Sequence, residues 1–223
     1  KQYVRSLYEG EMGYVDDHVG RVLSWLDDHN LLENTYICLT ADHGEEFWDH
    51  GLFFHGQSVY NELIHVPLII AGPGIAAGHR RDDVISAIDV MPTLAGLMGE
   101  PTPVEWRGQS WAEVLLKGGP APSAPAFAQG TCESATEPMR AVVQNADKLV
   151  LRMESGNAEL YDLTSDPGEQ HDLSETVPQK VIDLNHALTN WSTSFRSVFA
   201  DGDAAGAVDS EILERMNAVG YLD

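Results

Sequence analysis

Two different periods of apolar residues run along the first hundred positions of the chain. Residues 2–30 carry apolar side chains at helical spacing with charged residues between them, which predicts an amphipathic helix. Its apolar face would hold Tyr3, Leu7, Val15, Val19, Val22 and Leu26. Short apolar runs then predict strands, at residues 35–41, 66–71 and 84–88. Apolar strands that alternate with helices are typical of an α/β layer fold around a parallel sheet.

The pattern after residue 88 predicts two more helices and then a change of architecture. Asp89 is expected to cap a helix with Pro92 in its first turn, and Trp111 to Leu116 a second, shorter helix. Residues 118–126 are rich in Pro, Gly and Ala, which indicates a linker. Beyond them, short runs separated by turn residues predict an antiparallel meander between residues 127 and 163.

The last part of the chain predicts an amphipathic helix at residues 178–200 and a short helix at 210–219. We therefore predict an α/β part over residues 1–117, a linker over 118–126, and a small C-terminal subdomain over 127–223.

Composition limits the partners of the chain more than its fold. With 13 Lys and Arg against 35 Asp and Glu, the net charge is −22, which argues against nucleic acid as a partner. No run of about 18 apolar residues is present, so no membrane span is expected. The two cysteines, Cys38 and Cys132, give neither a disulfide framework nor a zinc motif.

Candidate chemistry lies directly after the first predicted strand, at Asp42-His43-Gly44. Ligands tend to bind just beyond the carboxyl ends of strands in α/β sheets, and a carboxylate with an imidazole can ligate a divalent cation. Gly44 would allow a sharp turn there. Asp42 and His43 are therefore predicted to form half of a metal site, although the same tripeptide could also be a polar turn.

Three linked motifs resemble the C-terminal half of a sulfatase, a family of the alkaline phosphatase superfamily. They are TADHGEE with the following DHG and HG, then VPLIIAGPG with DVMPTLAGLMG, and finally ELYDLTSDPGEQHDL. The resemblance runs from Tyr3 to about Leu173 in the order of the family. It implies part of an alkaline-phosphatase-like α/β sandwich, followed by a smaller antiparallel sheet packed with a helix.

The resemblance also implies roles for individual residues. Asp42 and His43 correspond to metal ligands, and His55 corresponds to a position that contacts the sulfate or phosphate group of an ester substrate. Calcium is the metal expected first, with manganese, zinc and magnesium left open. His50 and Glu45 are expected to order the loop rather than to bind the metal.

The chain departs from the family at the nucleophile. The C/S-x-P-S/A-R motif, whose Cys is converted to formylglycine, is absent, and neither Cys38 nor Cys132 fits it. We therefore expect a fragment of a longer sulfuric ester hydrolase that is inactive alone, with the formylglycine in a missing N-terminal part. Two alternatives stay open. One is a fragment of a phosphonate or phosphodiester hydrolase, or of a phosphoglycerol or phosphoethanolamine transferase; the other is a non-catalytic module that self-associates.

Overall fold

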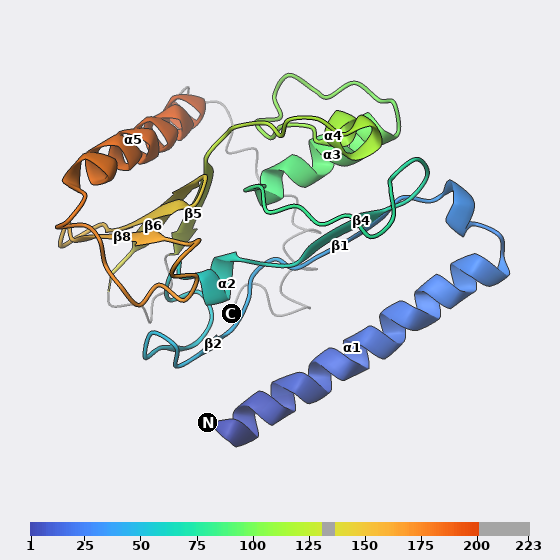
Figure 1. Ribbon diagram of the computed structural model, residues 1–223, viewed down its shortest axis with the longest axis horizontal. Helices are drawn as coiled ribbons and strands as arrows, with labels where there is room; N and C mark the ends of the chain where they lie inside the picture. Colours follow the sequence, from blue (N-terminus) through green and yellow to red (C-terminus); the bar gives the residue numbers. More distant parts are fainter. Residues whose placement is uncertain (131–136, 201–223) are drawn as a thin grey trace.

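The computed structural model describes residues 1–130 and 137–200, with side chains up to Ser194 (Figure 1). The predicted helix at 210–219 and Cys132 lie outside these residues. The helices are α1 (Gln2–Asp28), η1 (Leu32–Asn34), α2 (Asn61–Ile64), η2 (Ala87–Asp89), α3 (Val90–Leu97), α4 (Ala112–Lys117) and α5 (Pro178–Ala200). The strands are β1 (Ile37–Thr40), β2 (Glu46–Phe47), β3 (Phe53–Phe54), β4 (Leu68–Ala71), β5 (Ala126–Gly130), β6 (Met139–Gln144), β7 (Asp147–Arg152) and β8 (Ala158–Asp162). The α/β class with a C-terminal antiparallel sheet and a helix is confirmed.

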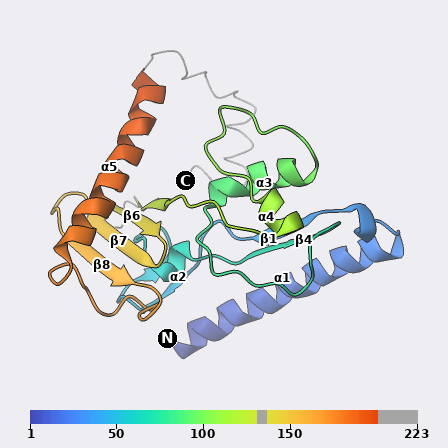
Figure 2. The ribbon, with the colours of Figure 1, turned by 45° about the horizontal axis from the view of Figure 1, so that its top comes forward.

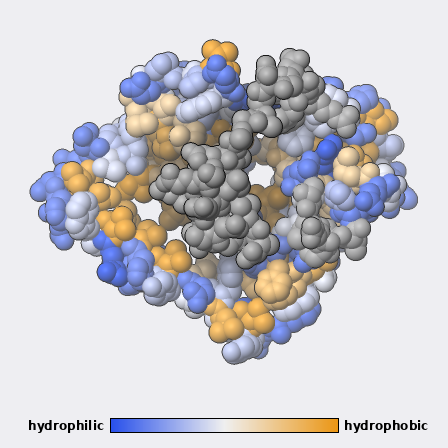
Figure 3. Space-filling view, turned by 180° about the vertical axis from the view of Figure 1, so that it is seen from behind, coloured by the Kyte–Doolittle hydropathy of each residue, from blue (hydrophilic) through white to orange (hydrophobic). Residues whose placement is uncertain are grey.

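Helix α1 forms as predicted, but its apolar face is not buried. None of its residues is buried, and Tyr3, Val22 and Trp25 are each more than half exposed. The helix runs along one side of the molecule in Figures 1 and 2, where Arg5 near its start donates to the carbonyl of Phe47 in β2 at 3.1 Å. Hydrophobic residues appear along it among hydrophilic ones in Figure 3. The amphipathic pattern therefore marks a face that the described part of the chain leaves uncovered. No helix in that part is long and apolar enough to cross a membrane.

Strands β1 and β4 form an antiparallel pair, so the predicted parallel arrangement is wrong. Ile37 pairs with Ala71 and Thr40 with Leu68, in a sheet of two strands. The apolar runs specify that these segments are strands, but the direction of pairing depends on how residues 41–67, between the two strands, return the chain. In Figure 2, α3 and α4 lie on one side of this pair and α1 on the other.

The predicted strand at residues 84–88 is absent, and Asp89 does not cap α3 with its side chain. Its carboxylate instead accepts hydrogen bonds from the backbone N–H of Ser86 (3.0 Å) and of Gln109 (2.7 Å). A capping box between Ser86 and Asp89 begins the 3₁₀ turn η2. The short apolar run at residues 84–88 predicts a strand instead, because a single apolar turn and a short strand have the same pattern in the sequence.

The predicted meander is confirmed as a four-stranded antiparallel sheet in the order β5-β6-β7-β8, hereafter the C-terminal sheet. One face buries Val142, Leu149 and Leu160 against Leu184 and Leu188 of α5. The opposite face buries Ala141, Val150 and Tyr161 against Val59 and Tyr60, which precede α2. The C-terminal sheet is thus covered on one side by its own helix and on the other by the segment that follows the candidate site. The division at residues 118–126 stays a prediction.

Candidate metal centre

Gly44 fixes the loop after β1 against α2. Its N–H donates to the carbonyl of Leu63 at 2.8 Å. A Cβ added to Gly44 would lie 1.9 Å from the carbonyl oxygen of Glu62, which no side chain could accommodate. Gly44 does not have a positive φ, so glycine is required here by this close approach of two backbone segments and not by the sharp turn expected from the sequence.

The hairpin of β2 and β3 brings the candidate residues together. Glu46 pairs with Phe54 and Phe47 with Phe53 in antiparallel register. Residues just before β2 therefore lie opposite residues just after β3, which places Glu45 opposite His55. This register explains why two histidines twelve positions apart in the sequence meet.

Asp42 and His43 each place one atom that can bind a metal ion, an oxygen and a nitrogen, close to the other. Oδ2 of Asp42 lies 3.7 Å from Nε2 of His43. The other ring nitrogen of His43, Nδ1, donates to the carbonyl of Gly44 at 2.8 Å, so Nε2 carries the lone pair in the neutral ring. The backbone N–H of His43 donates to Asp42 and, with the nearby His43 ring, lowers the pKa of this carboxyl, which favours the ionised form.

This pair fits two ligands of one divalent cation. Metal–ligand distances of about 2.0–2.6 Å place neighbouring ligands of one ion roughly 3–4 Å apart, and the two donors lie within that range. A backbone carbonyl that fixes the outer nitrogen of a histidine is also a usual feature of metal-binding histidines. In the described part of the chain, no cluster of three or more His, Cys, Asp or Glu side chains could hold a metal ion.

His55 lies against this pair. Its ring stacks on that of His43, with the ring centroids 4.3 Å apart. Nδ1 of His55 donates to Oε2 of Glu45 at 3.1 Å, and the side chain of His55 is half exposed while that of Glu45 is largely buried. Glu45 therefore orients the His55 ring beside Asp42 and His43.

His50 anchors the tip of the same hairpin. Nδ1 donates to Oε1 of Glu62 at 2.5 Å and Nε2 donates to the carbonyl of Glu169 at 3.1 Å, while the ring stacks on Tyr60. Since both ring nitrogens face acceptors, the imidazolium is the form that satisfies both. Burial opposes protonation, but the bond to Glu62 and the Glu169 carbonyl outweigh it and raise the pKa of His50.

A buried ion pair beneath the hairpin has no counterpart in the sequence predictions. Lys148 of β7 and Glu169 are completely buried, with Nζ of Lys148 2.6 Å from Oε1 of Glu169. By composition Asp166-Pro167-Gly168-Glu169 is typical of a turn, and Lys148 lies within the predicted meander. The signal in the sequence was a lysine that shares one side of β7 with Val150, a residue of the buried core.

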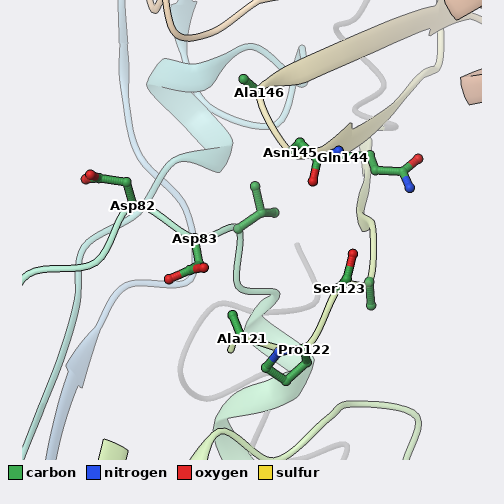
Figure 4. A pocket seen from close by; sticks show the side chains of 10 residues that line it. Asp82, Asp83, Ala121, Pro122, Ser123, Gln144, Asn145 and Ala146 are labelled. Atoms are coloured by element: carbon green, nitrogen blue, oxygen red, sulfur yellow. The ribbon is translucent and has the colours of Figure 1, made fainter. Parts of the chain in front are cut away.

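A cavity of about 390 Å³ lies elsewhere, between the segment at Asp82 and Asp83, the chain around Pro122, and the β6–β7 turn at Asn145 (Figure 4). None of the candidate metal or anion residues lines it. Asp83 is already paired with Arg81, whose Nε lies 2.7 Å away. This cavity is separate from the candidate centre.

Comparison with known proteins identifies the family of the chain. Residues 1–100, which contain Asp42, His43 and His55, match the family model described as Sulfatase. The chain belongs to the sulfatase family. It is 33% identical over 205 residues to the uncharacterized sulfatase YidJ of Escherichia coli strain K12, covering 88% of this chain and 40% of that protein. It is 29% identical over 197 residues to arylsulfatase K of Xenopus laevis, covering 83% of this chain and 36% of that protein.

Solved sulfatase structures share the fold of the chain. The structure of BT1596, described as a 2-O GAG sulfatase, matches with a TM-score of 0.71 at 28% identity, covering 83% of this chain and 42% of that one. This chain therefore spans about two fifths of the length of the sulfatases it matches. The match extends past the α/β part, which indicates that the C-terminal sheet also belongs to the shared architecture.

Proposed function

We propose that this chain supplies two metal ligands and one anion-binding histidine to a sulfuric ester hydrolase. The observation that carries the proposal is the convergence of Asp42, His43 and His55, with a 3.7 Å separation between the two donors and a ring stack between the histidines. Membership of the sulfatase family supports it.

The three side chains have complementary tasks at a sulfate ester. A bound divalent cation would act as a Lewis acid on the non-bridging oxygens of the ester. Asp42 would supply negative charge to that cation and His43 a neutral nitrogen. His55, stacked on His43, would contact the ester oxygens beside them. Glu45 keeps the His55 ring in place through its bond to Nδ1.

Calcium is the cation that we propose first, with manganese, zinc and magnesium as alternatives. A carboxylate oxygen suits calcium and magnesium, while the imidazole of His43 also suits manganese and zinc. The similarity to a 2-O GAG sulfatase favours a sulfated saccharide as the ester substrate.

The nucleophile of the reaction is not provided by this chain. Neither Cys38 nor Cys132 stands in a C/S-x-P-S/A-R motif, so we propose that a formylglycine lies in another part of the whole protein. The purified chain with calcium should therefore leave an aryl sulfate intact. Turnover that is lost in Asp42→Asn would show that the chain contains a complete site and would overturn this part of the proposal.

Calorimetric titration of calcium at about 0.15 M salt tests the metal site, because salt at this concentration screens the diffuse attraction of the acidic surface. Two ligands should bind weakly, with a dissociation constant on the order of 10⁻⁴–10⁻³ M. Asp42→Asn should abolish this binding, while Asp82→Asn removes the same charge from an exposed aspartate outside the centre and should preserve it. Equal binding by both variants would contradict the proposal.

A further inference from the structure

Lys148 stands at the centre of a buried polar network that joins the C-terminal sheet to α2. Its Nζ lies 2.6 Å from Oε1 of Glu169 and donates to Oδ1 of Asn61 at 3.1 Å. The backbone N–H of Asn61 donates to the other carboxylate oxygen of Glu169 at 2.6 Å. Asn61 is the first residue of α2, so both ends of this network meet where the helix begins.

The same short helix holds the candidate metal centre at two points. Its Leu63 carbonyl accepts the hydrogen bond from Gly44, which directly follows the proposed ligand His43. Its Glu62 carboxylate accepts the hydrogen bond from His50, between the ligands and His55 in the sequence. A displacement of α2 would therefore move both sides of the hairpin that brings His43 and His55 together.

Tyr60 adds a second attachment of α2 to the sheet, next to the first. Its hydroxyl donates to Oε2 of Glu159 at 2.6 Å and accepts from Nη2 of Arg152 at 3.2 Å. Three consecutive residues, 60 to 62, thus carry bonds to β7, to β8 or to the hairpin. Of these links, only the one through Lys148 is a fully buried ion pair, with both side chains 0% exposed.

Removal of one partner from a buried ion pair leaves an uncompensated charge, and the surrounding structure rearranges to hydrate it. Without Lys148, the carboxylate of Glu169 would lose its counter-charge while still bonded to Asn61 N–H. Opening of the contact between α2 and β7 would let water reach that carboxylate. The region that opens is the support of the Gly44 hydrogen bond.

We propose that Lys148 is a positioning residue for the metal centre, holding α2 so that Gly44 and His50 keep the ligand hairpin in place. The proposal rests on the proposed function as far as metal binding is concerned, but its mechanical part does not require a metal. The side chain of Lys148 touches neither the cation nor the ester; it acts through Asn61, α2 and Gly44.

The test compares Lys148→Met with Lys180→Met. Lys180 also pairs with an acidic residue of β7, Asp147, at 2.7 Å, but at a half-exposed position on α5, which covers the opposite face of the C-terminal sheet from α2. Two readouts are used: the calcium dissociation constant, and the exchange rate of the Gly44 amide hydrogen measured by NMR without metal. Lys148→Met should weaken calcium binding about tenfold, as losses of supporting residues around metal ligands do. It should also raise the ratio of the Gly44 exchange rate to the exchange rate of Val142 in β6. Lys180→Met should change neither the calcium dissociation constant nor this ratio of exchange rates.

A purely structural role for Lys148 predicts a different pattern. Gly44 and Val142 would then exchange faster by the same factor, because the whole fold would be less stable, and this result would overturn the proposal. If Lys148→Met does not fold, Glu169→Gln replaces it, since an amide keeps the shape and removes the charge. If Glu169→Gln folds and its Gly44 amide hydrogen exchanges at the same rate as in the wild type, the proposal is also overturned.

The two proposals fail in distinguishable ways. If Asp42→Asn leaves calcium binding unchanged, the metal assignment fails, and Gly44 exchange alone decides the positioning role of Lys148. If Asp42→Asn abolishes binding but Lys148→Met leaves both calcium affinity and Gly44 exchange unchanged, the metal assignment stands and the positioning role is wrong.

Discussion

Gly44 shows how a single residue sets the position of the candidate centre. It lies against the backbone of Glu62 so closely that no Cβ fits between them. The sequence indicates that glycine is needed, but it assigns the need to a turn, since a contact between residues 44 and 62 leaves no local pattern. Asp42, His43 and His55 could be identified from their motif, whereas the stack of the two histidines depends on the register of the β2–β3 hairpin.

Substitution of Gly44 by alanine should destabilise the fold. The added methyl group would overlap the Glu62 carbonyl and displace either the loop or α2, at a cost of about 1–3 kcal/mol. Gly20→Ala is the matched control, because nothing lies within 4 Å of the position of its Cβ and alanine favours the helix α1. Denaturant unfolding should show a loss for Gly44→Ala and no loss for Gly20→Ala; equal stability of the two variants would contradict the close approach.

At the scale of elements, local periodicity predicts the helices and strands well and their pairing poorly. The helix at 2–30 and the meander after 127 appear at the expected places because each pattern is long or repeated. The 3₁₀ turn at Ala87–Asp89 was missed because a short apolar run is typical of a strand as well as of a turn. The antiparallel direction of β1 and β4 was missed because pairing direction depends on residues far along the chain. The buried Lys148–Glu169 pair was missed for the same reason.

The contact of the hairpin with α2 should make stability depend on pH through His50 and Glu62. Burial alone would raise the pKa of Glu62, but the bond from His50 lowers it, and the same bond raises that of His50. The contribution of Glu62 is lost as pH falls through its lowered folded pKa. The contribution of His50 is complete below its ordinary pKa of about 6.5 and is lost as pH rises through its raised folded pKa.

His50→Gln should therefore cost most stability between about pH 4.5 and 6.5 and progressively less at higher pH. Thermal unfolding of wild type and variant across this range at constant salt measures the difference. Addition of Glu62→Gln to His50→Gln should cost little more, because the two residues act as one pair. A stability difference that grows with pH would be the opposite of this expectation.

The whole molecule carries a net charge of −22 and an uncovered amphipathic helix. We propose that the chain self-associates through α1, whose exposed apolar residues include Val22 and Trp25. The long-range mutual repulsion of the acidic chains opposes this and weakens as salt is added, so association should increase with salt.

Light scattering over a range of protein concentrations measures the association directly. The mass should rise above the 24.4 kDa of one chain, and Val22→Glu should reduce the rise. Val104→Glu adds the same charge at a 97% exposed residue outside α1 and should leave the association unchanged. A constant mass of one chain at every concentration would show that α1 does not mediate self-association.

The most direct test of the metal centre is to locate a bound cation. Mn²⁺ is paramagnetic and broadens the imidazole NMR signals of nearby histidines, and the chain has nine histidines as reporters. As Mn²⁺ is added, the signals of His43 and His55 should broaden first, and Asp42→Asn should prevent this selective broadening. Equal broadening of all nine signals, or selective broadening that excludes His43, would contradict the assignment of Asp42 and His43 as metal ligands.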